Sequence, residues 1–157
     1  GGAPESVAAR LSAADPGRRR RQLAILSADG RGAAWSGDDN DPWRGHRIAT
    51  DRVVAGNRLA GPEALDALEA GFEAATGPLA RRLLAGLRAA HAAGGDAHGL
   101  GSAAIVVVCA EAPPLDIRAD LGPDPLAALE RTLDAIDAPG HQAFLARVPR
   151  LSDRGRC

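Results

Sequence analysis

Residues 93–109 read Ala-Gly-Gly-Asp-Ala-His-Gly-Leu-Gly-Ser-Ala-Ala-Ile-Val-Val-Val-Cys, and this stretch decides the fold. Its first half is a glycine-rich loop that holds one carboxylate, Asp96. Its second half, from Ser102 to Cys109, is rich in β-branched residues and predicts a buried strand. Because functional side chains are often carried by loops at the ends of rigid strands, we expect a site near Asp96.

The sequence on either side of this stretch alternates between hairpin and helix patterns. Asp29-Gly30 separates two short apolar runs and predicts a hairpin of 22–27 with 32–36, followed by a polar loop at 37–46. Helical spacing, capping residues and turn residues predict four helices. These lie at 4–14, from Pro62 to the break at Thr76-Gly77-Pro78, from Leu79 to Gly94-Gly95 and from Asp124 onward. Further strands are predicted within 47–56 and, beyond a Pro113-Pro114 turn, at 116–118. Strands grouped in antiparallel sets, with helices between the sets, predict an α+β fold.

The chain has 157 residues, which suffices for one domain with its own core; we assign residues 1–137 to it and expect a poorly ordered tail at 138–157. The net charge of −1 favours neither nucleic acid nor a membrane surface, and we expect neither as a partner. The arginines at 18–21 predict a solvated turn, with a phosphate or nucleic-acid contact as the alternative. Cys109 and Cys157 predict no structural disulfide, which agrees with a cytoplasmic setting.

Absent residue types exclude several chemistries. The chain contains no Lys, which excludes a Schiff base, and no cysteine pair that would form a zinc ribbon. The spacing of His91, Asp96 and His98 matches no metal-ligand signature, so we expect no metal and no cofactor. The chain also contains no Met, and we therefore expect it to begin inside a longer protein.

Four polar residues are candidates for a site, and each has a structural alternative. Asp96 can orient a nucleophile or a substrate amine, or it can bond to the backbone of its own turn. Asn57 follows a strand and can donate to an oxyanion, or it can form an Asx turn. His46 can act as a base or as a loop histidine bonded to backbone, and Ser102 can bind substrate or cap its strand. We expect Asn57 and Asp96 to converge at the rim of one cleft between two packed sheets.

Taken together, the motifs of this chain resemble the DUF1028 family of bacterial proteins, whose members are often described as N-terminal-nucleophile (Ntn) hydrolase superfamily proteins. The resemblance runs from about residue 2 to residue 136, and it depends on the order and spacing of several short motifs. These are Ala14-Asp15-Pro16-Gly17 with Gln22, Ala34-Trp35-Ser36-Gly37, Trp43-x-Gly45-His46, Gly56-Asn57-x-Leu59-x-Gly61, Leu83-Leu84, Ala93-Gly94-Gly95-Asp96, Ser102-Ala103-Ala104 and Asp116-x-Arg118.

The resemblance implies an αββα sandwich, in which two antiparallel sheets lie between helical layers. It also implies a similarity to amide hydrolases whose nucleophile is the first residue of the mature chain, a Thr, Ser or Cys. Gly1 has no such side chain, so the family pattern implies that the first strands and the nucleophile are missing here. The loop after Asp96 departs from the family pattern as well, because Ala97, His98 and Gly101 replace the usual Arg and Gln.

On this basis the sequence predicts a fragment of an Ntn-type amide hydrolase that is inactive alone, with an unknown small-molecule amide as substrate. Asn57 and Asp96 are the predicted catalytic residues, and His46, Ser102 and Arg118 the predicted substrate-binding residues. The alternative is a non-catalytic small-ligand-binding or assembly module of the same fold. Unpaired sheet edges, or helices, would allow a homo-oligomer. A third reading is a chain that does not fold stably by itself.

Overall fold

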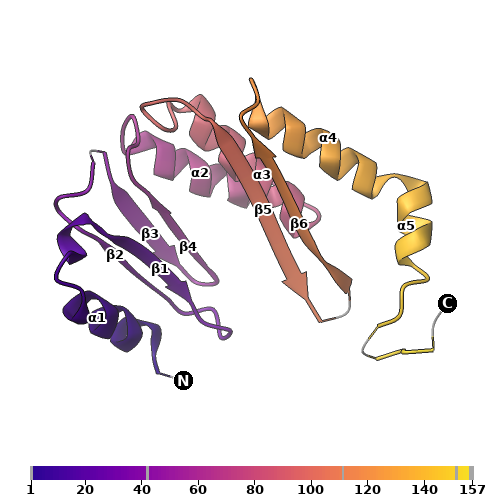
Figure 1. Ribbon diagram of the computed structural model, residues 1–157, viewed down its shortest axis with the longest axis horizontal. Helices are drawn as coiled ribbons and strands as arrows, with labels where there is room; N and C mark the ends of the chain where they lie inside the picture. The colour runs from indigo at the N-terminus through magenta and orange to yellow at the C-terminus, as the bar shows by residue number, and fades with distance from the viewer. Residues whose placement is uncertain (1, 42, 111, 151, 156–157) are drawn as a thin grey trace.

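The structure is a computed structural model that describes residues 2–41, 43–110, 112–150 and 152–155. Its elements follow one another in the order α1 (Pro4–Ala14), the 3-10 helix η1 (Arg18–Arg20), β1 (Gln22–Leu26), β2 (Gly32–Ser36), β3 (Gly45–Ala49), β4 (Arg52–Gly56), α2 (Glu63–Ala74), α3 (Leu79–Ala92), β5 (Ser102–Cys109), β6 (Ala112–Asp120), α4 (Pro125–Asp137) and α5 (Pro139–Leu145) (Figure 1). Consecutive strands pair as three antiparallel two-stranded sheets, β1–β2, β3–β4 and β5–β6. This mixture of helices and antiparallel strands confirms the predicted α+β class.

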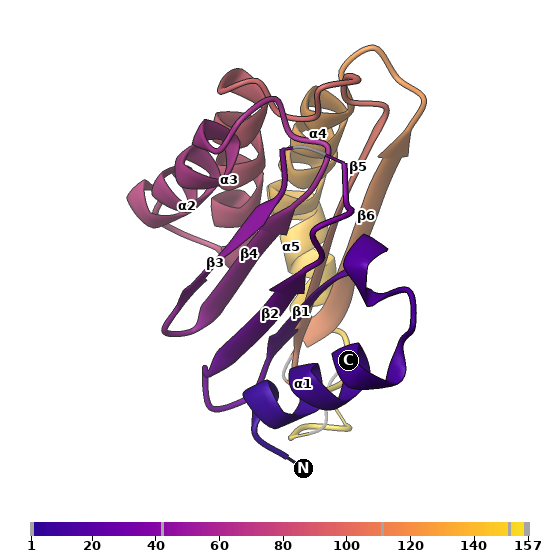
Figure 2. The ribbon, with the colours of Figure 1, turned by 90° about the vertical axis from the view of Figure 1, so that its left-hand side faces the viewer.

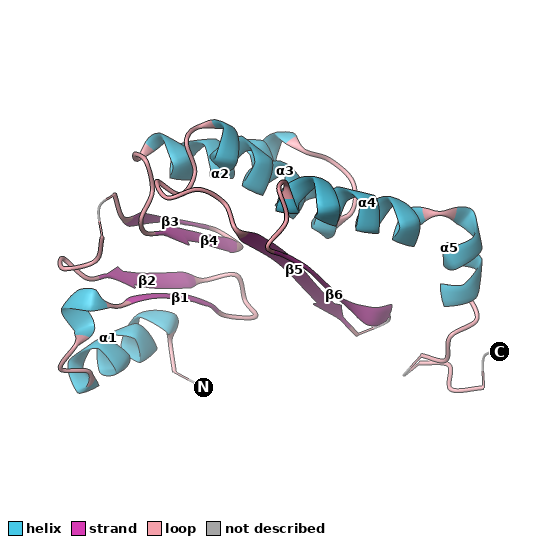
Figure 3. Ribbon diagram, turned by 45° about the horizontal axis from the view of Figure 1, so that its top comes forward, coloured by secondary structure: helices cyan, strands magenta, loops and turns pink. Residues whose placement is uncertain are grey.

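The first two sheets lie face to face, with helices on their outer sides. Figure 3 shows α2 above β3–β4, then β1–β2, and α1 below. The inner faces approach closely at Gly32, where a Cβ atom would lie 2.5 Å from Cγ2 of Val53. On the outer face of β3–β4, Arg47 bonds to Asp66 of α2. Arg52 binds two further carboxylates of α2 in the same way, so charged side chains hold that helix against the sheet.

The largest apolar cluster lies elsewhere, between α3, α4 and one face of β5–β6. Its fully buried members are Ala80, Leu84, Ile105, Ile117, Leu126, Leu129 and Leu133. The predicted start of α4 is confirmed, because a carboxylate oxygen of Asp124 accepts from the backbone N–H of Ala127 at 2.8 Å and Pro125 follows it. Figure 2 shows α4 running beside this sheet at the side of the molecule away from α1.

The prediction of a buried strand at Ser102–Cys109 is wrong, because only one face of β5 is covered. Ile105 points into the cluster and is 3% exposed, whereas Val106 and Val108 on the other face are 57% and 75% exposed. The predicted Pro113-Pro114 turn is also wrong. Both prolines lie within β6, where the register shifts between Val107 and Cys109 and leaves them without a ladder partner, as proline requires.

The chain after Asp137 contains the short helix α5, where the sequence predicted no regular element. Pro139 occupies its first turn, and Gln142 donates its side-chain amide to the carbonyl of Ile136 at 2.8 Å. The domain boundary at residue 137 stays a prediction.

Cys109 is exposed and free, and Cys157 lies outside the described residues. No helix within the described ranges is both long and apolar enough to cross a membrane.

Close packing of α2 on α3 predicts that Gly86 cannot be replaced. A Cβ atom there would lie 2.9 Å from the carbonyl oxygen of Leu68, which is backbone and cannot move aside cheaply. We expect Gly86→Ala to lower the free energy of unfolding by about 1–3 kcal/mol in urea titrations. Gly140→Ala in α5 is the matched control, since its Cβ would meet nothing within 4 Å. It should be neutral or stabilising by up to about 1 kcal/mol. Equal effects at both positions would contradict the packing argument.

The β1–β2 turn predicts a pH dependence. The carboxylate of Asp29 accepts hydrogen bonds from the Ser27 hydroxyl and from the backbone N–H and guanidinium of Arg31, and these lower its pKa from 3.8 to about 2. Because the folded pKa is the lower one, the contribution to stability is complete above pH 3.8 and is lost as the pH falls through about 2. Carbon-13 NMR of the Asp29 carboxyl should show this value, with the urea-unfolded chain as reference. Titration at the same pH in both states would refute it.

Candidate functional site

The four strand ends at one edge of the paired sheets meet around the side-chain amide of Gln22. Its Nε2 atom lies 2.9 Å from Oγ of Ser36, 3.0 Å from the carbonyl oxygen of Gly45 and 2.9 Å from that of Gly56. Gln22 pairs with Ser36 in the first sheet, and Gly45 pairs with Gly56 in the second. One carboxamide therefore connects the terminal residue pair of each sheet, and these hydrogen bonds are half-buried.

The donors and acceptors of this network fix the orientation of the Gln22 amide. Carbonyl oxygens only accept, so the nitrogen of the Gln22 amide must face Gly45 and Gly56, and its two hydrogens are shared among these carbonyls and the Ser36 hydroxyl oxygen. Oγ of Ser36 also lies 3.0 Å from Nδ1 of His46, and the tautomer of the ring decides which of the two atoms donates. His46 lies in β3 and bonds to a side chain, which differs from the predicted loop histidine bonded to backbone.

Asn57 joins the same network from the residue that follows β4. Its Nδ2 atom donates to Oε1 of Gln22 at 3.0 Å, and its side chain is exposed. Asn57 also lines a cavity of about 420 Å³ together with Arg20, Asp39, Asn40 and Asp41. A hydrogen bond from Arg19 lowers the pKa of Asp39, so that carboxylate stays charged at neutral pH. The cavity thus combines carboxylates with one cation and two amides.

The chain turns sharply after Asn57 and then pairs with the glycine-rich loop. Arg58 has a φ of 57°, in the left-handed region that non-glycine residues rarely adopt. Its carbonyl accepts from the N–H of Ala97 at 2.7 Å, and Leu59 forms an isolated antiparallel bridge with Asp96. The backbone therefore brings the segment after Asn57 alongside the loop that contains Asp96.

The two predicted catalytic side chains nevertheless make different contacts. Oδ1 of Asp96 accepts from the backbone N–H of His98 at 2.7 Å and lies 3.6 Å from Nδ1 of the same residue. These are the contacts of the turn that the sequence offered as the alternative for Asp96. The residues that line the cavity at Asn57 do not include Asp96, so a common cleft for both stays a prediction.

Ser102 and Arg118 lie in the separate sheet β5–β6. Ser102 pairs in register with Asp120, and Arg118 donates to Oδ2 of Asp120 at 2.6 Å. That hydrogen bond raises the pKa of Arg118 and lowers that of Asp120. β5 begins at the end of the molecule where β4 leads into Asn57 (Figure 1), but no hydrogen bond or ion pair within the described part of the chain links Ser102 or Arg118 to the Gln22 network.

Sequence reasoning did not select Gln22 or Ser36 as site residues. A signal for both was present, because a hairpin centred on Asp29 places Gln22 opposite Ser36. The arginines at 18–21 form η1 and its flank, where Arg19 binds Asp39 and Arg21 binds Asp15. Among the described residues no group of three or more His, Cys, Asp or Glu side chains is arranged to hold a metal ion.

Comparison with known proteins identifies a family and a similar solved structure. A family of unknown function, DUF1028, matches residues 1–129. The crystal structure of protein SPO2555 from Silicibacter pomeroyi, assigned to the same family, superposes with a TM-score of 0.88 at 34% sequence identity. The match covers 99% of this chain and 70% of that one. No curated protein sequence matches.

The network predicts that Gln22 stabilises the joined sheets. Gln22→Leu keeps the approximate size but leaves the Gly45 and Gly56 carbonyls without their donor, and we expect a loss of about 2 kcal/mol in the free energy of unfolding by urea. Gln142→Leu, at an exposed hydrogen bond on α5, is the control and should change stability by less than about 0.5 kcal/mol. A Gln22→Leu protein as stable as its control would show that the carboxamide does not hold the sheets.

Proposed function

This chain belongs to the DUF1028 family, and we propose that it forms one wall of an Ntn-type amide-hydrolase site. The observation that supports this best is the state of the Asn57 amide. One hydrogen of Nδ2 is bound to Gln22, which holds the group in place, and the second is not used by any described residue. A fixed donor with a spare hydrogen at a cavity suits the stabilisation of an oxyanion formed from a substrate amide.

We assign the neighbouring polar groups to substrate binding. Asp96 uses Oδ1 in its turn, and its Oδ2 remains available to accept from a substrate amine or hydroxyl. His46 contributes Nε2, the ring nitrogen that does not contact Ser36. Ser102 and Arg118 would contact a more distant part of the substrate from β5–β6. The substrate class is a small molecule with an amide bond.

The proposed fold is the αββα sandwich of the Ntn hydrolases. The order of α2, the two sheets and α1 in Figure 3 supports it. In that chemistry the side chain of a terminal Thr, Ser or Cys attacks the amide carbon, and its own α-amine takes the proton. We propose that the groups around Asn57 and Asp96 bind and position the amide in this chemistry.

A second candidate is a non-catalytic module of the same fold that binds a small ligand or a partner chain. Two observations favour it. Ala97, His98 and Gly101 stand where the family pattern has Arg and Gln, and one oxygen of Asp96 is engaged by its own turn. For either function we propose a bacterial, cytoplasmic protein, in agreement with the exposed free thiol of Cys109, and neither nucleic acid nor a membrane as partner.

Titration of nitrogen-15-labelled protein with N-acetyl amino acid amides tests the assignment. We expect the side-chain N–H signals of Asn57 to shift on binding. Asn57→Asp keeps the shape but removes both donor hydrogens, and Asp96→Asn removes the charge; each should weaken binding about tenfold. Asp153→Asn, in the C-terminal turn, is the control and should bind like the parent.

The outcomes separate the two candidates. Binding of amides, but not of matched carboxylates, with loss in both variants supports the amide-hydrolase wall. Equal binding of amides and carboxylates supports the non-catalytic module. No shift at Asn57 with any amide, or unchanged affinity in Asn57→Asp, overturns the proposed site.

A further inference from the structure

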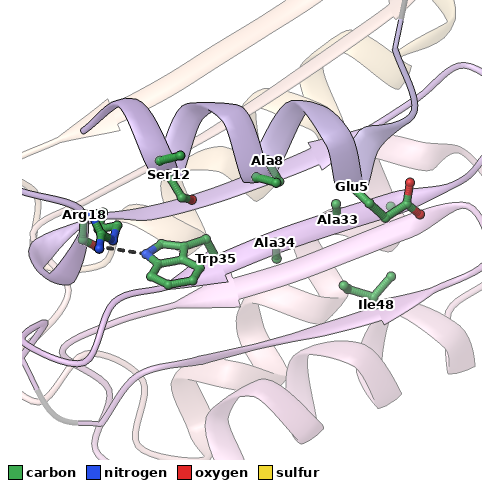
Figure 4. A pocket seen from close by; sticks show the side chains of 11 residues that line it. Glu5, Ala8, Ser12, Arg18, Ala33, Ala34, Trp35 and Ile48 are labelled. Atoms are coloured by element: carbon green, nitrogen blue, oxygen red, sulfur yellow. Dashed lines mark hydrogen bonds between the residues drawn. The ribbon is translucent and has the colours of Figure 1, made fainter. Parts of the chain in front are cut away.

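A groove beside β2 lies apart from the site described above. It has a volume of about 670 Å³ and lies between α1 and β2, with Ile48 of β3 on its lower side (Figure 4). Four consecutive residues of β2, Gly32 to Trp35, line it. Consecutive residues of a strand point to opposite faces, so a groove lined by all four follows the edge of the strand.

The hydrogen-bond register leaves this edge unpaired. Two bonds at the ends of the β1–β2 ladder, Gly37 N–H to the Arg21 carbonyl and Ser27 N–H to the Arg31 carbonyl, are both 2.9 Å. Alternation along the ladder then makes Ala24 and Ala34 a non-hydrogen-bonded pair, so the N–H and C=O of Ala34 point away from β1. β2 pairs with no other described strand. The edge is open to strand addition.

One polar side chain at the groove lacks a hydrogen-bond partner among the described residues. Ser12 of α1 is 8% exposed, and its hydroxyl oxygen is buried without a hydrogen-bond partner in the described part of the molecule. Figure 4 shows this side chain directed from α1 toward the groove. A buried polar group left in this state is costly, so a chain bound in the groove would gain by supplying a partner.

The charges and side-chain sizes along the groove complement those of a second copy related by a two-fold axis. Glu5 lies at one end and Arg18 at the other (Figure 4), and neither forms an ion pair with a described residue. A two-fold axis through Ala34 would bring the Glu5 end of each groove toward the Arg18 end of the other. The same axis sets Trp35 of one copy opposite the small side chain of Ala33 in its partner, and β2 itself carries no charge that would repel.

We propose that this groove binds β2 of a second copy of the chain. The two β2 strands would pair antiparallel about Ala34, and the two β1–β2 hairpins would join into one four-stranded sheet with both α1 helices on the same face. A C2 contact of this kind uses the same patch on each copy. The proposal does not depend on the amide-hydrolase assignment, because no residue of the Gln22–Asn57 network other than Ser36 lies on this edge.

Sedimentation equilibrium of the 157-residue chain over about 1–500 µM tests the proposal. We expect a reversible dimer of twice 16.0 kDa. Ala34→Pro removes the N–H that points to the partner and should raise the dimer dissociation constant about a hundredfold. Ala24→Pro is the matched control, since it changes the paired residue on the opposite edge of the same hairpin, and it should leave the dimer intact. Circular dichroism checks that each variant is folded.

A charge exchange on exposed side chains decides the question even where a proline variant does not fold. Glu5→Arg and Arg18→Glu should each weaken the dimer about tenfold, and the double variant should restore it. A chain that stays monomeric at every concentration overturns the proposal, whether or not it binds a foreign peptide. A dimer indifferent to these charges, or weakened as much by Ala24→Pro as by Ala34→Pro, places the contact elsewhere and also overturns it.

Discussion

Two sheets that share no strand pairing are held in register by the carboxamide of Gln22. Its nitrogen contacts the carbonyls of Gly45 and Gly56, which form one residue pair of β3–β4, while its own residue is paired with Ser36 in β1–β2. Its oxygen then accepts from Asn57. The positions of His46, through Ser36, and of Asn57 are therefore set by one side chain. A neutral amide suits this role, because it offers donors and an acceptor without the desolvation cost of a charge.

Much of the fold could be predicted from local patterns. The turn residues Asp29-Gly30, the cap at Asp124 and the leucine spacing in α2 and α3 are short-range signals, and the elements form where these signals lie. The pairing of Gln22 with Ser36 follows from the same turn. That these residues also meet Gly45, Gly56 and Asn57 depends on how two hairpins pack, and a single sequence carries little information on such long-range contacts.

The misjudged strand shows a different limit. The stretch Ala104-Ile105-Val106-Val107-Val108 shows no alternation of apolar and polar residues, because both of its faces are apolar. Composition therefore cannot distinguish a strand covered on both faces from one covered on a single face. Asp116, Arg118 and Asp120 on the paired strand do carry that information, since they alternate with the buried Ile117 and face the side that has no covering layer among the described residues. Reading the two strands as a pair would have found the exposed face.

The apolar cluster between α3, α4 and β5–β6 includes no residue of α1, β1 or β2. The hairpin β1–β2 with α1 is instead attached through small residues at the sheet interface, such as Gly32, and through the Gln22 network. Stability is thus distributed unevenly along the chain. Backbone amide protons of the first 36 residues should exchange with solvent through partial opening, whereas those of α4 should exchange only through global unfolding. Gln22, which positions Asn57, lies within these first 36 residues.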